Sequence, residues 1–223
     1  MDYSFLSKTI LFRGMIPEDI KSLLTCMSAQ AKSYSKGDIV YNVGDYVNAI
    51  GLVLSGSVYI ENDDVWGNKS ILDKIGPGQI FAETYACVQG EPLMINVVAG
   101  EKTNILFLNT EHMLTTCTNA CHFHSKVIRN LLELSSQKSL NLSRRIIHTS
   151  SKTIRGRLLS YLSFQSTKQG VQEFDIPFNR QQLADYLSID RSAMSNELSK
   201  MQKDGLIEVN KNHFILHDID SII

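Results

Sequence analysis

The sequence lacks the features of a membrane protein or a secreted protein. It has no apolar run approaching the roughly 20 residues that a membrane-spanning helix needs. Residues 1–4 do not open a cationic segment followed by an apolar one, so we expect no signal peptide. We therefore expect a cytoplasmic protein with no membrane partner, in which the four cysteines are reduced.

A strong excess of charge of one sign is also missing. The net charge is −1, which argues against a protein that coats nucleic acid but permits one that reads a short site. The 223 residues, of which 43% are hydrophobic, suffice for two domains with separate cores. Eight basic residues nevertheless gather between positions 126 and 157, opposed there only by Glu133. This stretch is either a surface for a DNA backbone or a solvated helix face. The eight residues are Lys126, Arg129, Lys138, Arg144, Arg145, Lys152, Arg155 and Arg157.

Glycine is unevenly distributed, and its distribution divides the chain. Ten of the 13 glycines lie before residue 110. After a short amphipathic helix at 17–27, runs rich in Ile, Val and Leu alternate there with turn residues such as Gly, Asn and Asp. Many short strands at such spacing predict a jelly-roll-like sandwich or barrel. The expected strands are 38–41, 49–54, 57–60, 70–75, 94–99 and 104–108.

The segment 120–147 contains neither glycine nor proline and predicts one long helix. Val127 and Leu131 begin an apolar stripe that continues toward Leu142 and Ile146. One small β-domain is too short to cover such a helix, so we expect its free face to pack on a second copy of itself. The alternative is a helix that lies across its own domain.

Residues 179–206 predict two short helices joined by a tight turn. Met194, Leu198 and Met201 share one face of the second helix, and Asp190 is a suitable N-cap for it. The opposite face carries short hydrogen-bonding groups and two cations, which suit base edges and phosphates in a DNA major groove. The alternative is a surface helix pair of another helical domain. The residues of this face are Arg191, Ser192, Ser195, Asn196, Ser199 and Lys200.

A β-hairpin is predicted directly after these helices. Apolar runs at 206–209 and 213–216 flank a polar turn at 210–212. A hairpin in this place is a wing, and Lys211 at its tip could reach a phosphate. Helix pair and wing together are far more specific than the helix pair alone.

In its order of elements, the chain resembles the Crp/Fnr family of bacterial transcription regulators over essentially its whole length. The resemblance implies an α+β fold with a jelly-roll-like effector-sensing β-roll (1–119), a dimerisation helix (120–148) and a winged helix-turn-helix DNA-binding domain (149–223). It also implies a homodimer that binds a palindromic operator in double-stranded DNA and acts with RNA polymerase. The stretches that carry the likeness are 11–15, 36–38, 54–58, 76–81 and 190–195.

The resemblance also implies roles for single residues. Arg191 takes the place of the family's base-reading arginine, Ser195 and Asn196 point the same way, and Arg180 resembles a residue that contacts the DNA backbone. The family often has glutamate and a second arginine where this chain has Ser192 and Asn196. The half-site therefore need not be the one read by the best-known members.

The sensor departs further from the family. Members that bind cyclic nucleotides have Gly-Glu-Leu and, about ten residues later, an Arg-Ser pair whose arginine holds the cyclic phosphate. The first place here reads Ala-Glu-Thr at 82–84, and the second is Leu93-Met94. Leucine cannot neutralise a phosphate, so we expect no cyclic nucleotide binding. Glu83, Tyr85, Leu93 and Met94 would line either a pocket for a small organic effector or plain core.

A metal or redox role is the remaining chemical alternative. The cysteine cluster of the family's iron–sulfur members is absent before Cys26. Cys117, Cys121, His122 and His124 are close in sequence and could bind zinc or haem iron, or could be small half-buried residues. We expect no metal, no cofactor and no enzyme. The alternative is a cupin-like ligand-binding module or enzyme without DNA activity. Against it, the predicted roll of this chain has no His and Glu residues close enough in sequence to form a metal site. The sequence names neither effector nor operator, nor activation or repression.

Overall fold

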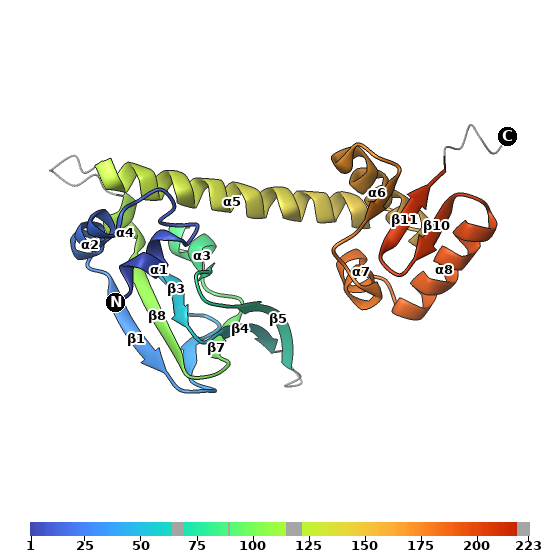
Figure 1. The fold of residues 1–223 in the computed structure, drawn as a ribbon. Coiled ribbons are helices and arrows are strands. Elements are labelled where there is room, and N and C mark those ends of the chain that lie inside the picture. Colours follow the sequence, from blue (N-terminus) through green and yellow to red (C-terminus); the bar gives the residue numbers. More distant parts are fainter. Residues whose placement is uncertain (64–68, 89, 115–121, 218–223) are drawn as a thin grey trace. The chain divides into compact units, whose positions relative to one another are not determined.

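The computed structural model describes residues 1–63, 69–88, 90–114 and 122–217, and it confirms the predicted fold class (Figure 1). The chain divides into two compact units, Met1–Ser136 and Gln137–Ile223. The division falls within helix α5 (His122–Thr149), so each unit contains one part of this helix. Residues 120 and 121 of the predicted long helix lie outside the described residues.

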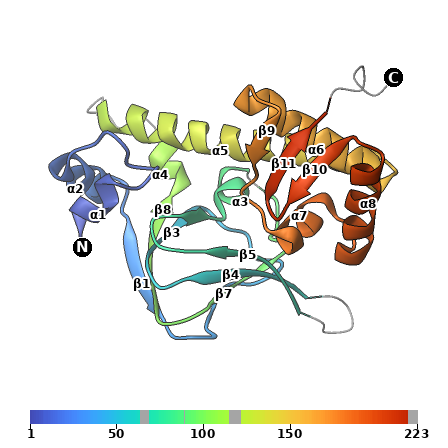
Figure 2. The ribbon, with the colours of Figure 1, turned by 45° about the vertical axis from the view of Figure 1, so that its right-hand side comes forward.

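Two antiparallel four-stranded sheets form the β-roll of unit 1. The strand order is β1-β8-β3-β6 in one sheet and β2-β7-β4-β5 in the other, and Figure 2 shows β7, β4 and β5 side by side. The bounds of the first sheet are β1 Gln30–Tyr34, β8 Thr103–Asn109, β3 Ala49–Ser55 and β6 Ile80–Phe81. Those of the second are β2 Ile39–Tyr41, β7 Asn96–Ala99, β4 Val58–Asp63 and β5 Lys69–Ile75.

Strands β3 and β8 of the first sheet bury side chains on both faces, because side chains alternate along a strand. Leu106 and Leu108 of β8 pack with the helices of unit 1, whereas Ile105 and Phe107 point between the two sheets. The register carries this division across the sheet, since Phe107 lies opposite Gly51 of β3. The helices of unit 1 other than α5 are α1 Tyr3–Ser7, α2 Pro17–Cys26, α3 Glu83–Cys87 and α4 Thr110–Leu114.

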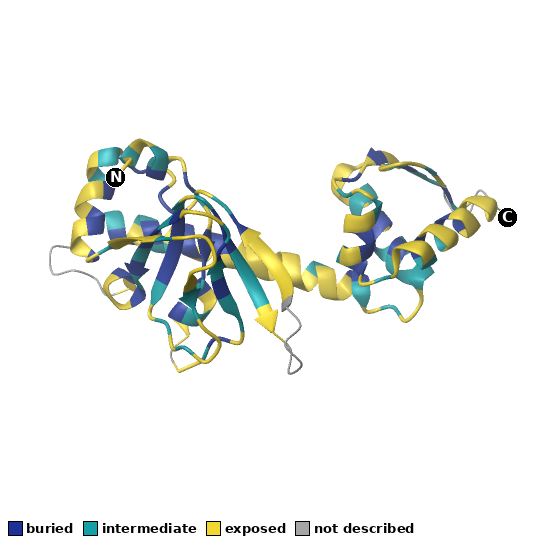
Figure 3. Cartoon of the chain, turned by 90° about the horizontal axis from the view of Figure 1, so that it is seen from below, coloured by how far each residue is buried: buried dark blue, intermediate teal, exposed yellow. Residues whose placement is uncertain are grey.

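Helix α5 changes its surroundings along its length. Val127, Leu131 and Leu134 belong to the core of unit 1. The Asn130 amide there donates to the carbonyl oxygen of Leu11 at 2.9 Å. Residues 135–143 are all exposed and appear yellow in Figure 3. None of the helices in the described ranges is long and apolar enough to span a membrane.

Unit 2 packs three helices against a three-stranded sheet of order β10-β11-β9 around one apolar core. Strand β9 places Phe174 opposite Phe214 of β11, and both rings are buried. The elements are α6 Ile154–Gln169, β9 Glu173–Asp175, α7 Arg180–Leu187, α8 Arg191–Lys203, β10 Ile207–Asn210 and β11 His213–Leu216.

His148 joins the last turn of α5 to the core of unit 2. Its ring is 2% exposed and lies between Tyr161, Phe164 and Tyr186, with centroid distances of 5.6, 5.2 and 6.1 Å. Its Nδ1 atom lies 3.1 Å from the hydroxyl of Ser160. Burial lowers the pKa of His148, and the charge of Arg144 lowers it further. The imidazole is therefore held neutral within an aromatic cluster.

We predict that His148 makes the protein less stable as the pH falls. Its folded-state pKa lies below the ordinary value of 6.5, so the unfolded chain binds the proton first and the free energy of unfolding decreases below that pH. Chemical unfolding of the full chain at about pH 5 and about pH 7 measures the effect. His148→Phe should reduce the gain in stability between the two pH values.

His213→Asn is the control of opposite sign. Hydrogen bonding to Asp175, and then to Glu173, raises the pKa of His213, so its contribution is present at low pH and is lost as the pH rises. Its removal should increase the gain in stability from pH 5 to pH 7. An unchanged pH dependence in His148→Phe would contradict the assignment.

Candidate nucleic-acid interface and sensor residues

Helix α7 begins at a capping box. The Asn179 side chain accepts from the amide of Gln182 at 2.9 Å, and the Gln182 side chain accepts from the amide of Asn179 at 2.8 Å. Two amides at the helix start are thus satisfied reciprocally. This arrangement fixes the first turn of α7, where Arg180 is the first helical residue.

The turn between α7 and α8 is set by local hydrogen bonds. Ser188 adopts a left-handed conformation with φ of 54°, and the amide of Ile189 donates to the Ala184 carbonyl at 2.9 Å. Asp190 caps α8, as the sequence predicts, by accepting from the amide of Ala193 at 2.8 Å. Its carboxylate also accepts from the Ser192 hydroxyl, and this bond first, then the amide, lowers the pKa of Asp190.

Two arginines bind the carboxyl end of α7, where helix carbonyls lack partners within the helix. Arg157 donates to the carbonyls of Leu187 and Ser188 at 3.2 and 2.9 Å. Arg145 donates to the carbonyls of Tyr186 and Asp185 at 3.1 and 3.2 Å.

These contacts argue against the interpretation of the basic stretch at 126–157 as one continuous surface for a DNA backbone. Arg145, Arg155 and Arg157 are tied to groups of their own domain, and the guanidinium of Arg144 lies 5.4 Å from the centroid of Phe164. Much of the charge in this stretch therefore holds unit 2 together instead of forming one open basic surface.

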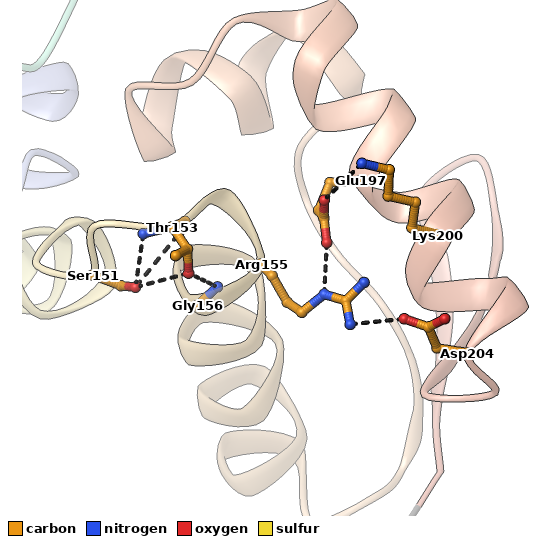
Figure 4. A network of polar contacts seen from close by, with 7 residues as sticks. All are labelled: Ser151, Thr153, Arg155, Gly156, Glu197, Lys200 and Asp204. Atoms are coloured by element: carbon orange, nitrogen blue, oxygen red, sulfur yellow. Dashed lines mark hydrogen bonds and ion pairs between the residues drawn. The ribbon is translucent and has the colours of Figure 1, made fainter.

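Arg155 of α6 links the carboxylate of Glu197 on α8 to that of Asp204, the C-cap of the same helix (Figure 4). Its Nε atom lies 2.6 Å from Glu197, and its Nη1 atom lies 2.7 Å from Asp204. Hydrogen bonding to Glu197, and then to Asp204, raises the pKa of Arg155. Glu197, the only acid between positions 191 and 203, is thereby drawn toward α6. The rest of α8 presents no carboxylate to an approaching phosphate.

The outer face of α8 is polar, and its inner face is buried. Met194, Leu198 and Met201 are 0%, 2% and 0% exposed, as predicted. Within the part of the chain that the structure describes, the side chains of Arg191 and Asn196 make no hydrogen bond and are available to a ligand. The six residues predicted for the outer face are all exposed: Arg191, Ser192, Ser195, Asn196, Ser199 and Lys200.

The serine hydroxyls of this face are already used as donors. Ser195 donates to the Arg191 carbonyl at 2.9 Å, and Ser199 donates to the Ser195 carbonyl at 3.1 Å. Ser192 donates to Asp190. The side chains of Arg191 and Asn196 are therefore the donors that this face offers most readily, and Lys200, whose ammonium lies 4.0 Å from Glu197, adds an exposed cation.

The wing and the start of α7 enclose a cavity of about 510 Å³. Arg180 and Lys211 supply its two cations, and none of the described residues that line it is acidic. The Nη1 atom of Arg180 is buried and has no hydrogen-bond partner among the described residues, and burial lowers the pKa of Arg180. The Arg180 guanidinium stacks 5.5 Å from the ring centroid of Phe214. Such a hollow suits an anion.

The residues predicted for the effector pocket have different environments. Glu83 is 6% exposed and Leu93 is 1% exposed, whereas Tyr85 is half-buried. Met94 is 74% exposed and faces solvent in the single chain. Ala82, which precedes α3, has a φ of 60°, a left-handed conformation that is costly for any residue other than glycine.

The structure leaves the predicted cysteine–histidine group largely outside the described residues. Cys117 and Cys121 lie outside them, and so does the side chain of His122, while His124 is buried. Within the described ranges, no group of three or more His, Cys, Asp or Glu side chains could hold a metal ion.

Comparisons with known proteins match both units. The family of cyclic nucleotide-binding domains matches residues 31–120, and that of Crp-like helix-turn-helix domains matches residues 156–222. The Cyclic AMP receptor protein of Thermus thermophilus is 25% identical over 199 residues, which cover 89% of this chain and 88% of that protein. Electron transport regulator A of Shewanella oneidensis is 23% identical over 198 residues, 84% of this chain and 74% of that protein.

A solved structure supports the fold. The crystal structure of the Catabolite Activator Protein of Thermus thermophilus aligns with a TM-score of 0.52 and 22% identity, covering 96% of each chain. At this level of identity, the likeness concerns the fold and not the ligands.

Proposed function

Because the chain belongs to the Crp/Fnr family of DNA-binding transcription regulators, we propose that α8 reads one half of a palindromic operator in double-stranded DNA. The members of this family bind DNA, typically dimerise and are not enzymes, which sets aside the cupin-like enzyme. The observation that carries the proposal is the outer face of α8, from which the one carboxylate is withdrawn by Arg155.

Within this face, base edges and phosphates would be contacted by different residues. Arg191 is long, exposed and free to make two parallel hydrogen bonds with guanine, and Asn196 can do the same with adenine. Ser192, Ser195 and Lys200 would add contacts around them. Arg180 and Lys211, at the cavity beside the wing, would bind a backbone phosphate. A phosphate would also supply the partner that the buried Nη1 atom of Arg180 lacks.

The second partner is another copy of the chain. Along α5, Leu132, Leu142 and Ile146 are 66%, 62% and 67% exposed. Together with Ser135 and Ser139 they follow one another at alternating spacings of three and four residues, which is the spacing of a coiled-coil seam. Two copies joined along this seam would present two recognition helices to the two half-sites.

The third partner is a small-molecule effector, and we infer that it is not a cyclic nucleotide. Residues 83–94 contain no arginine or lysine, and Leu93 stands in the place of the phosphate-binding arginine. A small organic effector bound near Glu83, Tyr85, Leu93 and Met94 would shift the population between two arrangements of the paired chains. Contact with RNA polymerase and a cytoplasmic location belong to the same proposal.

The base-reading role of Arg191 is tested on the protein's own promoter region and on base-substituted versions of it. Arg191→Ala should weaken binding to the preferred sequence by about 1–3 kcal/mol and should relax selectivity at one base pair of each half-site. Arg180→Met is the matched comparison, because it should weaken binding to all sequences alike and reduce the salt dependence. Equal losses on all sequences for Arg191→Ala would show that this residue reads no base.

The dimer seam is tested by adding a charge to it. Leu142→Lys should shift the protein from dimer to monomer in analytical ultracentrifugation, because the charge would be buried between the two helices. Asn141→Lys is the control, since helical geometry turns this exposed neighbour away from the seam. A Leu142→Lys protein that remains as dimeric as Asn141→Lys would place the interface elsewhere.

The exclusion of cyclic nucleotides is tested by calorimetry on the full chain. Titration with cAMP or cGMP should give no saturable heat in the micromolar range, because no cation meets the cyclic phosphate. Leu93→Arg should not create a site by itself, since Ala82 and Met94 also differ from the family's pattern. Micromolar binding by the unmodified protein would contradict the inference.

A further inference from the structure

A cavity of unit 1 lies between the two sheets and has a volume of about 410 Å³, within the range of small-molecule sites. It shares no residue with the wall around Glu83. The register places its residues on one face of the first sheet, because Gln30 pairs with Phe107 and Ala49 pairs with Asn109. Val40 and Tyr41 of β2 close it from the second sheet.

Aromatic rings form the apolar part of this cavity. The Phe107 ring lies edge-on to Tyr34 and Tyr41, with centroid distances of 6.4 and 5.9 Å. The Tyr41 hydroxyl donates to the Ala49 carbonyl across the gap between the sheets at 3.2 Å, which fixes the angle of its ring. A flat aromatic ligand would meet faces and edges of three rings here.

The polar side chains that line this cavity include basic residues and amides. The Lys32 ammonium lies 5.6 Å from the Phe107 ring centroid, and His112 stands at the rim. Gln30, Asn48 and Asn109 contribute amide groups, and none of the described residues that line the cavity is acidic. The nearby carboxylates of Asp38 and Asp45 are engaged by turn amides, those of Ser35 and Asn42, at 2.7 and 2.8 Å.

We propose that this cavity binds a small aromatic carboxylate, whose ring lies among Tyr34, Tyr41 and Phe107 and whose carboxylate meets Lys32. An anion here completes a charge-assisted hydrogen bond with an ammonium whose one partner among the described residues is the Phe107 ring. The amides at the rim discriminate among polar substituents on the ring. The proposal goes beyond DNA recognition and does not depend on it.

The proposal is tested by titrating the full-length protein with benzoate in the absence of DNA. Calorimetric titration should give saturable binding with a Kd on the order of 1 mM or tighter, as expected for so small a ligand. Benzamide, which keeps the ring but lacks the charge, and cyclohexanecarboxylate, which keeps the charge but lacks the ring, should each bind at least about tenfold more weakly. Equal binding of benzoate and benzamide would overturn the role of Lys32.

Variants locate the site. Lys32→Gln, at an exposed position of β1, should weaken benzoate about tenfold and leave benzamide unchanged. Lys36→Gln is the control, because Lys36 is also exposed and does not line the cavity, and benzoate should bind it as it binds the unmodified protein. Tyr34→Leu should weaken both ligands.

Two results would overturn the proposal. One is the absence of saturable benzoate binding up to about 20 mM. The other is benzoate binding that Lys32→Gln leaves unchanged. Neither result bears on DNA binding, so a failure here leaves the proposed function intact.

Discussion

The polar outer face of α8 depends on the bridge that Arg155 makes to Glu197 and Asp204. A partly exposed ion pair such as Arg155–Glu197 contributes little to stability, because solvent screens it and two long side chains must be ordered. Its importance here is positional. Glu197 is the one acid on α8, and Arg155 turns its carboxylate toward α6 while joining the middle and the end of α8 to the same helix. Without the bridge, the Glu197 carboxylate would lose the partner that turns it toward α6, and α8 would lose its two ion pairs with that helix.

Other arginines of unit 2 also bind groups of their own domain. The density of basic residues in the sequence is therefore a poor guide to where a DNA-binding surface lies. From the sequence, the stretch 126–157 is consistent with an open basic surface. In the structure, Arg145 and Arg157 close the carbonyl end of α7, and Arg155 binds carboxylates. Sequence alone could not separate these roles, because the partners lie 30 to 49 residues away in the chain. Arg191 differs from these arginines, because its side chain binds no carboxylate and no helix end among the described residues. It is therefore available to bind a ligand.

Local patterns predicted helices α7 and α8 and most strands of the roll because the information is local. Apolar side chains at helical spacing and the Asp190 cap define α8, and short runs rich in Ile, Val and Leu define strands such as β3. The strands that were missed depend on distant partners. β1 is almost wholly polar and exposed and is held by its ladder to β8, and β9 offers only Phe174. Ala82 likewise gives no sign in the sequence of its left-handed conformation, which persists because the neighbouring Phe81 and Glu83 are buried.

This difference between local and distant information also separates the two kinds of site. The face that we propose to read DNA lies on one helix, so a spacing of three and four residues reveals which side chains share it. A cavity in the roll is lined by residues from four strands and from α4, between positions 28 and 112, and only the pairing register brings them together. A motif comparison can therefore show that the arginine of a phosphate site is missing, but it cannot show where another ligand would fit. For this reason the outer face of α8 can be predicted from the sequence. A ligand site in the β-roll has to be inferred from how rings and charges pack in the structure.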